Sequence, residues 1–357
     1  MKQETLDFVI PLYQVRWSIR AVLEGLTEHY QPRSIHIIMP FAGVRSPIGD
    51  ASASSLKEDV KKWQVSSVYI HEEEFFFQKK SNLTKDMICA ELDLGKSLYN
   101  PGWFYQQLLK LGASEGIDDL SEWYTVWDSD LLPVNPWQIR CENQGKVEYK
   151  FALLQHNQWG NNQIVSSWEQ WIRSILGVEP LMDRDGTFIP HHMCFKQEHL
   201  ESFKGKLNQY FQSDDDWLLL MMRSANKFGT FSEYWSYVSW VAQKAPGDLA
   251  FHPYQDYGET TERFFDDGTG LFSTALKNYR STIYQPSEER FSESFFPSYR
   301  EVESFIRAEY REDKLPSSLS FESSPRHLKK NKENMHIEEL RSRWNPRMTE
   351  TTSEQTN

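Results

Sequence analysis

Cysteine is scarce in this chain of 357 residues, which contains only Cys89, Cys141 and Cys194. An odd number of cysteines without a Cys-x-x-Cys spacing excludes a disulfide framework and a cysteine-based zinc site. We expect all three to be reduced thiols that pack as small apolar side chains.

Long apolar runs are lacking as well. No stretch approaches the roughly 18 consecutive apolar residues that a membrane-spanning helix needs. The first residues lead directly into the apolar run 8–13, without the charged head, long apolar stretch and cleavage site of a signal peptide. We therefore expect no transmembrane segment and a cytoplasmic location.

The chain also lacks an excess of basic residues. Lysine and arginine number 39 against 51 aspartates and glutamates, so the formal net charge is −12. Such a chain is poorly suited to neutralising the phosphates of DNA or RNA, which argues against a dedicated nucleic-acid-binding protein. A negative surface also repels nucleotides unless a cation intervenes, so an anionic ligand would favour metal assistance.

Apolar strand-like runs alternate with helix-like segments in the first half of the chain, over residues 6–13, 17–28, 35–39 and 67–71. This alternation predicts an α/β fold with a mostly parallel central sheet flanked by helices. Ligands bind at the carboxyl ends of the strands in such sheets, and Pro11 and Tyr13 follow the first strand. We expect one domain over residues 1–310 and a polar, loosely packed tail over 311–357.

The sequence Asp128-Ser-Asp130 follows a short apolar run, 123–127. Residues two apart on a strand point to the same side, so the two carboxylates can converge on one cation. Mn²⁺ or Mg²⁺ is suited by one or two carboxylates when a diphosphate and water supply the other oxygens. The pair also occurs by chance in acidic chains, but its position after a strand-like run and before Pro133 favours a site.

Histidines offer a third ligand for that cation. His191 and His192 lie in an apolar run, where only one of them can face the site if the run is a strand. His252 is an alternative ligand, and a buried structural histidine is the competing interpretation.

Residues 101–112 predict a helix that ends at Gly112. One stripe, formed by Phe104, Leu108 and Leu111, is typical of a buried face, and the neighbouring stripe carries Gln107 and Lys110. A lysine in this setting is usually a solvated charge, and the alternative is a ligand of phosphate or sugar.

Glu233 lies in the first turn of a second predicted helix, with Ser232 as its N-cap. An acidic residue there complements the helix dipole. The functional interpretation is a general base or a group that binds the acceptor hydroxyl, because an alcohol is a poor nucleophile at neutral pH. Tyr237, one turn later, would share the face of Glu233.

Four motifs together resemble a family of Asp-x-Asp glycosyltransferase-like proteins long catalogued as a domain of unknown function. The family pattern has a Trp-x-x-Gln-Gln-x-x-Lys-Leu helix, an Asp-x-Asp strand end, a His-His-Met segment and a Phe-Ser-Glu-Tyr segment. In this chain the motifs are matched over residues 103–111, 128–130, 191–193 and 231–234. The resemblance covers about residues 5 to 270, and it departs at Trp235, where the pattern has an acidic residue.

The resemblance implies a GT-A-like, Rossmann-type sandwich with a small antiparallel addition. It also implies a glycosyltransferase that uses a nucleotide-sugar donor, with a UDP-sugar expected. The acceptor would be a glycan or another molecule with a hydroxyl group. The resemblance places the cation on Asp128 and Asp130. With the residue interpretations, the resemblance predicts that Asp130 and Glu233 act in catalysis. The residues expected to bind the donor are Pro11, Tyr13, Gln107, Lys110, Asp128 and Tyr237. The residues expected to bind Mn²⁺ or Mg²⁺ are Asp128, Asp130, His191 and His192.

Two other functions compete with this prediction. A phosphatase with an aspartate nucleophile also places Asp-x-Asp after a strand, but near the start of the chain and with Thr or Val where Leu132 stands here. A noncatalytic carbohydrate-binding protein would use some of the 13 tryptophans as stacking platforms, although aromatic residues mostly pack in cores.

Overall fold

The computed structural model describes residues 6–13, 15, 18–41, 44–46, 49–51, 53–65, 67–135, 138–143, 146–152, 162–182, 188–252, 262–264, 296–309, 315 and 318–321. The chain forms two compact units. Unit 1 comprises residues 1–15, 31–129 and 138–254, and unit 2 comprises residues 16–30, 130–137 and 255–357.

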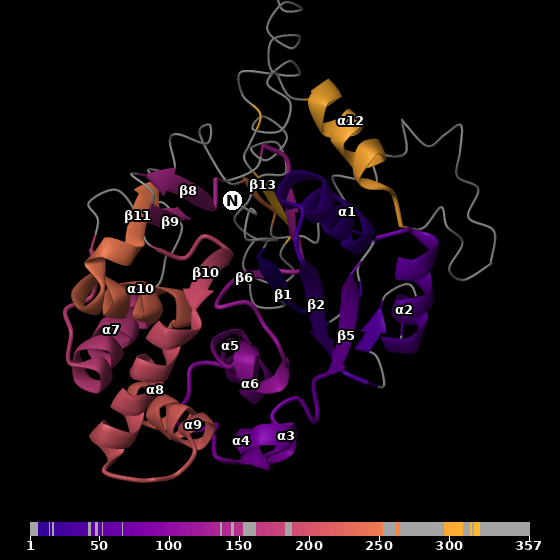
Figure 1. Ribbon diagram of the computed structural model, residues 1–357. Coiled ribbons are helices and arrows are strands. Elements are labelled where there is room, and N and C mark those ends of the chain that lie inside the picture. The colour runs from indigo at the N-terminus through magenta and orange to yellow at the C-terminus, as the bar shows by residue number, and fades with distance from the viewer. Residues whose placement is uncertain are drawn as a thin grey trace, which may run out of the picture. The chain divides into compact units, whose positions relative to one another are not determined.

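Unit 1 is built on a five-stranded sheet with the order β10-β6-β1-β2-β5 (Figure 1). Its strands are β1 (Asp7–Pro11), β2 (Ser34–Met39), β5 (Val68–Glu72), β6 (Trp123–Trp127) and β10 (His192–Lys196). The first four run parallel, and β10 joins antiparallel to β6. The predicted α/β fold with a mostly parallel central sheet flanked by helices is therefore confirmed.

The remaining elements of unit 1 are helices and two small sheets. The helices are α2 (Ala53–Lys62), α3 (Gln78–Ser81), α4 (Lys85–Ala90), α5 (Pro101–Leu111), α6 (Ala113–Gly116), α7 (Asn162–Trp171), a π-helix (Ile172–Leu176), α8 (Gln197–Phe211), α9 (Trp217–Phe228), α10 (Glu233–Lys244) and a 3₁₀ turn (Pro246–Asp248). The small sheets contain β3 (Val44–Ser46) with β4 (Gly49–Ala51), and β8 (Arg140–Asn143) with β9 (Lys146–Ala152) and β11 (Leu249–His252).

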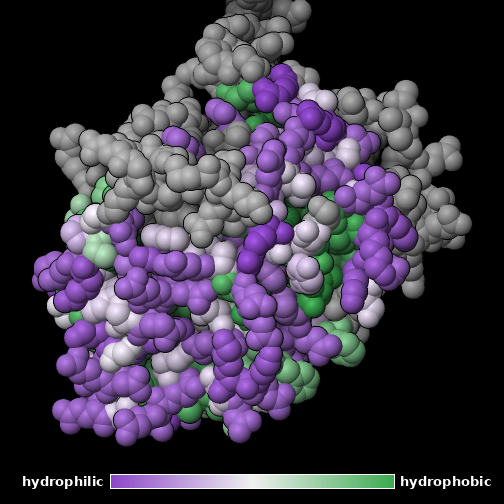
Figure 2. Space-filling view, in the orientation of Figure 1, coloured by the Kyte–Doolittle hydropathy of each residue, from purple (hydrophilic) through white to green (hydrophobic). Residues whose placement is uncertain are grey.

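One face of the sheet and the helices of unit 1 share a single apolar core. Alternate residues of a strand point to the same side, and Tyr124 and Val126 of β6 enter the core together with Phe195 of β10. Residues from α5, α7, α8, α9 and α10 also contribute to this core. The outer surfaces of α7, α8 and α9 are mostly hydrophilic, as expected for amphipathic helices that cover a core (Figure 2).

The two helices that carry predicted site residues begin with side-chain caps. Asn100 accepts a hydrogen bond from Trp103 N at the start of α5, and Pro101 occupies the first turn, where its missing N–H is not needed. Ser232 accepts from Trp235 N at the start of α10. The predicted ends at Gly112 and Ser232 are confirmed.

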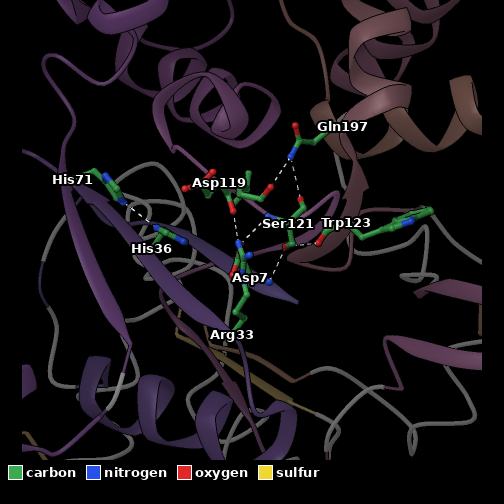
Figure 3. Close-up of polar contacts among 9 residues, drawn as sticks. Asp7, Arg33, His36, His71, Asp119, Ser121, Trp123 and Gln197 are labelled. Atoms are coloured by element: carbon green, nitrogen blue, oxygen red, sulfur yellow. Dashed lines mark hydrogen bonds and ion pairs between the residues drawn. The ribbon is translucent and has the colours of Figure 1, made fainter. Parts of the chain in front are cut away.

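The amino-terminal edge of the sheet is held by the buried carboxylate of Asp7 (Figure 3). Arg33, just before β2, binds both carboxylate oxygens, with Nε 2.9 Å from Oδ1. Ser121, just before β6, donates its N–H to Oδ2 over 2.8 Å, and its hydroxyl accepts from Asp7 N. One carboxylate thus joins the starts of three neighbouring strands.

Replacing Asp7 with Ala should lower the free energy of unfolding by about 2 to 4 kcal/mol, because Ser121 N loses its acceptor inside the protein and Arg33 loses its partner. Urea denaturation of the purified variant measures this loss. The exposed pair Glu58–Lys61 provides the control, since Glu58→Ala should change stability by less than about 0.5 kcal/mol. Equal losses in both variants would contradict the role assigned to Asp7.

Two histidines on neighbouring strands, His36 of β2 and His71 of β5, form a pair. Nδ1 of His36 is 3.0 Å from Nε2 of His71 (Figure 3). The His36 ring also stacks on Tyr69, with centroids 5.4 Å apart. Burial, followed by the neighbouring His71, lowers the pKa of His36 to about 4. Burial also lowers the pKa of His71. Both rings are therefore neutral in the folded protein near neutral pH.

This pair should make the fold sensitive to mild acid. The unfolded chain binds a proton at His36 near its ordinary pKa of about 6.5, whereas the folded protein binds it only near 4. The stabilisation is thus complete above pH 6.5 and is lost as the pH falls toward 4, by up to about 3 kcal/mol. The melting temperature of the wild-type protein should fall as the pH is lowered from 7.5 to 4.5, and that of His36→Gln should fall less steeply. Identical slopes of melting temperature against pH would contradict the role assigned to His36.

Unit 2 contains helices α1 (Ile19–Tyr30) and α12 (Tyr299–Glu309) and a three-stranded sheet with the order β12-β13-β7. Its strands are β7 (Leu131–Pro133), β12 (Glu262–Phe264) and β13 (Ser318–Phe321). The segment predicted to be a loose tail from residue 311 therefore supplies one strand, and the domain boundary at 310 stays a prediction.

Two local expectations were wrong. The apolar run that carries His191 and His192 forms a strand only from His192 onward, because His191 adopts a left-handed backbone with φ of 60°. Strand β6 ends at Trp127, so Asp128 lies beyond the strand and Ser129 and Asp130 lie in a turn. The alternation of strand side chains therefore does not apply across the Asp-x-Asp motif.

Two further expectations from the sequence concern the cysteines and membrane-spanning helices. Cys89 and Cys194 are free thiols, and the side chain of Cys141 lies outside the described residues. In the described part of the chain, no helix combines the length and the apolar character needed to cross a lipid bilayer.

Candidate functional site

Asp128 follows β6 at the carboxyl-terminal edge of the sheet, where ligands of parallel sheets bind. Asp7 and Val9 of β1 pair with Tyr124 and Val126 of β6, so the two parallel strands run side by side toward this edge. Asp128 is the first residue after β6, and Lys110 of α5 contacts its carboxylate.

Lys110, in the last turn of α5, lies between two carboxylates. Its Nζ is 2.8 Å from Oδ1 of Asp128 and 2.9 Å from Oε1 of Glu233. The Lys110 side chain is 5% exposed, and that of Glu233, the first residue of α10, is 7% exposed. Since a buried charge needs partners, this lysine is an internal ion-pair member and not the solvated charge that is usual for lysine.

His191 and Tyr234 complete the surroundings of Asp128. Nδ1 of His191 lies 3.0 Å from Oδ2 of Asp128, and the Tyr234 hydroxyl donates to Oδ1 over 3.4 Å. The left-handed backbone of His191 also brings its carbonyl within 3.0 Å of Asp128 N. An ionised carboxylate only accepts, so Nδ1 of His191 carries the proton in this contact.

The electrostatics of the cluster favour the charged forms of its central pair. Burial alone would raise the pKa of Asp128, but the Lys110 ammonium and the His191 hydrogen bond hold that pKa well below its usual range. Burial alone would lower the pKa of Lys110, but Asp128 and then Glu233 raise it well above its ordinary value. Both groups therefore remain charged at neutral pH.

Lys110 is further enclosed by aromatic rings. Its ammonium lies 4.6 Å from the centroid of the Tyr234 ring, and its backbone carbonyl accepts from the Tyr124 hydroxyl over 3.0 Å. A cation close to a ring face gains electrostatic attraction when it is desolvated. Residues 110, 128, 191, 233 and 234 are called the charged cluster below.

The charged cluster does not suit a divalent cation at Asp128. Both oxygens of this carboxylate already accept hydrogen bonds, and an ammonium 2.8 Å away would repel a second cation. Among the described residues, no group of three or more His, Cys, Asp or Glu side chains could hold a metal ion. The geometry therefore does not favour the expected set of Asp128, Asp130 and a histidine as one metal site.

The other histidines proposed as ligands lie in different surroundings. His192 is buried, with Nδ1 3.0 Å from the carbonyl of Pro190 and its ring 5.0 Å from that of Trp127. Burial lowers the pKa of His192 to about 4, so the ring is neutral. The side chain of His252 lies outside the described residues.

The remaining predicted donor residues divide into three groups. Pro11 ends β1, and Tyr13 just beyond it is 65% exposed on the carboxyl edge. Gln107, one turn before Lys110, is buried, and its Oε1 has no hydrogen-bond partner. The Tyr237 hydroxyl accepts from Lys196 N over 2.8 Å, and its ring packs on Phe195.

Tyr234 was missed as a site residue, although it belongs to the Phe-Ser-Glu-Tyr motif. Helical spacing favoured Tyr237, because residues four apart share a face. The structure brings Tyr234 to Asp128 instead, because Glu233 begins α10 and the next residue points toward β6. The sequence signal that could have identified Tyr234 is that it directly follows Glu233 in the Phe-Ser-Glu-Tyr motif.

Fold and site together define an α/β protein whose central sheet carries a buried charged cluster at its carboxyl edge. A family model described as "Family of unknown function (DUF6492)" matches residues 19–280. The chain belongs to this family. No protein with a curated description is similar enough in sequence to match the chain.

Three solved structures are similar to the chain at low identity. The apo form of mouse xyloside xylosyltransferase 1 is 9% identical, with a TM-score of 0.39, over 78% of this chain and 94% of that one. The PaToxG glycosyltransferase is 11% identical, with a TM-score of 0.31, over 84% and 87%. The apo bifunctional glycosyltransferase WbbM is 9% identical, with a TM-score of 0.37, over 90% and 46%. Similarity at this level assigns no residue a role.

Replacing Lys110 with Met should lower the free energy of unfolding by about 3 to 5 kcal/mol, because Asp128 and Glu233 would remain buried without their cation. The double variant Lys110→Met/Glu233→Gln should recover part of this loss, since it removes one of the two uncompensated charges. Chemical denaturation measures both. Lys96→Met, at an exposed ion pair with Asp93, is the control and should cost less than about 1 kcal/mol. A loss that small for Lys110→Met would refute the cluster's role in stability.

Proposed function

We propose that the protein is a glycosyltransferase that transfers a sugar from a nucleotide-sugar donor to a hydroxyl of a glycan or another acceptor. The observation that carries this proposal is the position of Asp128-Ser-Asp130. The motif begins at the carboxyl end of a central parallel strand, and its first carboxylate is fixed there by Lys110 and His191. A fixed Asp128 restricts where the turn with Asp130 begins.

The nucleotide end of the donor would lie near the end of β1. Pro11 ends that strand beside β6, and the exposed ring of Tyr13 is available to stack on a base. Because parallel strands open their carboxyl ends on one edge, this aromatic side chain and Asp128 belong to the same rim.

Gln107 and Lys110 receive different roles in this proposal. The buried Oε1 of Gln107 lacks a partner, so a sugar hydroxyl that donates to it would relieve the cost of an unsatisfied acceptor. Lys110 is held between two carboxylates and is therefore a poor ligand for phosphate. We assign it to holding Asp128 in place.

Glu233 was predicted to remove the proton of the acceptor hydroxyl. Its ion pair with Lys110 and its burial make it a component of the charged cluster. The proton-accepting role of Glu233 and the donor role of Tyr237 stay predictions.

Mn²⁺ or Mg²⁺ also remains a proposal. Asp128 does not suit a cation, so Asp130 is the carboxylate of the motif that we propose to bind it, together with diphosphate oxygens and water. When bound, such a cation would neutralise charge on the leaving diphosphate. The chain's own contribution is then to hold the turn that carries Asp130.

A noncatalytic carbohydrate-binding protein is less well supported. Binding modules of that kind present exposed aromatic platforms, whereas every described tryptophan side chain is buried or half-buried. Trp127 and Trp171, for example, are fully buried in unit 1. The exposed aromatic side chains of the described residues include Tyr13, Phe41, Tyr69 and Phe75, and Tyr13 lies on the sheet edge expected to bind the nucleotide.

A thermal-shift screen against UDP-, GDP-, CMP- and dTDP-sugars, each with and without Mn²⁺, tests the proposal. One donor should raise the melting temperature by about 5 °C at a hundredfold excess over its Kd, because it binds only the folded state. Asp130→Ala should abolish this shift and leave the unliganded melting temperature nearly unchanged. Asp118→Ala, at an exposed carboxylate, should retain the shift. The absence of a shift with all four nucleotides would overturn the proposal.

A further inference from the structure

The strand that follows Asp130 is paired with a strand from the far end of the chain. β7 begins at Leu131, directly after Asp130, and runs antiparallel to β13. Leu132 pairs with Leu319, and Pro133 pairs with Ser318. The backbone of the segment that leaves the Asp-x-Asp turn is therefore fixed by residues almost two hundred positions later.

This partner lies outside the part of the chain that the family model matches, which ends at residue 280. It is nonetheless well buried within unit 2. Leu319 and Ser320 of β13 are 0% exposed, and Tyr299, Val302 and Ile306 of α12 are at most 1% exposed. These buried side chains belong to the described residues of segment 296–321.

Helix α12 is fixed to α1 by polar contacts along the helix pair. Tyr299 N donates to Oε2 of Glu24 over 2.7 Å, and the Tyr299 hydroxyl lies 2.6 Å from Nε2 of His29. Arg300 forms an ion pair of 2.6 Å with Glu28. Buried side chains at positions 299, 302 and 306 form the apolar stripe expected of a packed helix.

Gly25 connects this helix pair to β7. A Cβ at Gly25 would lie 2.8 Å from the Tyr299 ring and 3.0 Å from Cγ of Pro133. Real side chains do not approach so closely, so α1 requires glycine at the point where α12 and β7 meet it. The packing of α12 and the position of β7 are thus linked through one residue.

We propose that the described residues of segment 296–321 are a positioning brace for Asp130, which holds β7 and thereby the turn that presents this carboxylate to the donor. The inference rests on the proposed function, because it concerns the same donor site. The brace touches no donor atom. It acts by restricting the conformations of the chain immediately after Asp130, so that less ordering is needed when the donor binds.

Gly25→Ala in the full chain tests the brace. The added methyl would push Tyr299 and Pro133 apart, which should accelerate amide hydrogen exchange at Leu131 and Leu132 and raise the Kd for the donor about tenfold. Gly205→Ala is the matched control, because Gly205 also lies within a helix but has nothing within 4 Å of an added Cβ. The control should leave both the exchange rates and the Kd unchanged.

A second variant, Leu319→Ala, removes a buried side chain of β13 beside β7 and should change exchange and Kd in the same direction. Faster exchange at Leu131 and Leu132 with a wild-type Kd in both variants would overturn the brace and leave the proposed function standing. Failure of the wild-type chain to bind any nucleotide-sugar would overturn both. A tenfold weaker Kd in both variants, with the control unchanged, would support the brace.

Discussion

The ion pair between Lys110 and Asp128 is the interaction on which the site depends. It joins the last turn of α5 to the end of β6, and the second carboxylate, Glu233, adds the start of α10. Three elements far apart in the sequence are thus held around one buried ammonium. Since isolated charges inside a protein are strongly unfavourable, each member requires the others. The cluster consequently fixes Asp128 at the carboxyl edge of the sheet.

Local features of the fold could be predicted from the sequence, because they depend on neighbouring residues. The capping of α10 by Ser232 and the end of α5 at Gly112 follow from preferences of helix ends. The parallel sheet follows from the alternation of apolar runs and helices. Pairing over long distances could not be predicted in this way. Nothing local indicates that Lys110 meets Glu233, or that β13 pairs with β7.

The Asp-x-Asp motif shows which part of the predicted site depends on tertiary structure. Its two carboxylates belong to different compact units, Asp128 to unit 1 and Asp130 to unit 2. The spacing of Asp128 and Asp130 in the sequence suggested that they bind one cation together. The surroundings of Asp128, however, contain an ammonium, an imidazole and a phenol hydroxyl. The sequence singled out Lys110, Asp128, His191 and Glu233, which the structure brings together, but what each of them contacts depends on tertiary structure. Asp128 is therefore the fixed carboxylate, and Asp130 is the carboxylate that we propose meets the donor.

The release of free sugar and nucleotide from nucleotide-sugars without an acceptor tests the central claim most directly. A glycosyltransferase whose donor site forms at this edge should hydrolyse one donor slowly in the presence of Mn²⁺ or Mg²⁺, because water can replace the missing acceptor. The wild-type chain should release nucleoside diphosphate from a UDP-sugar, and Asp130→Ala should not. Hydrolysis at equal rates by both proteins, or none with any nucleotide-sugar, would contradict the assignment of this site.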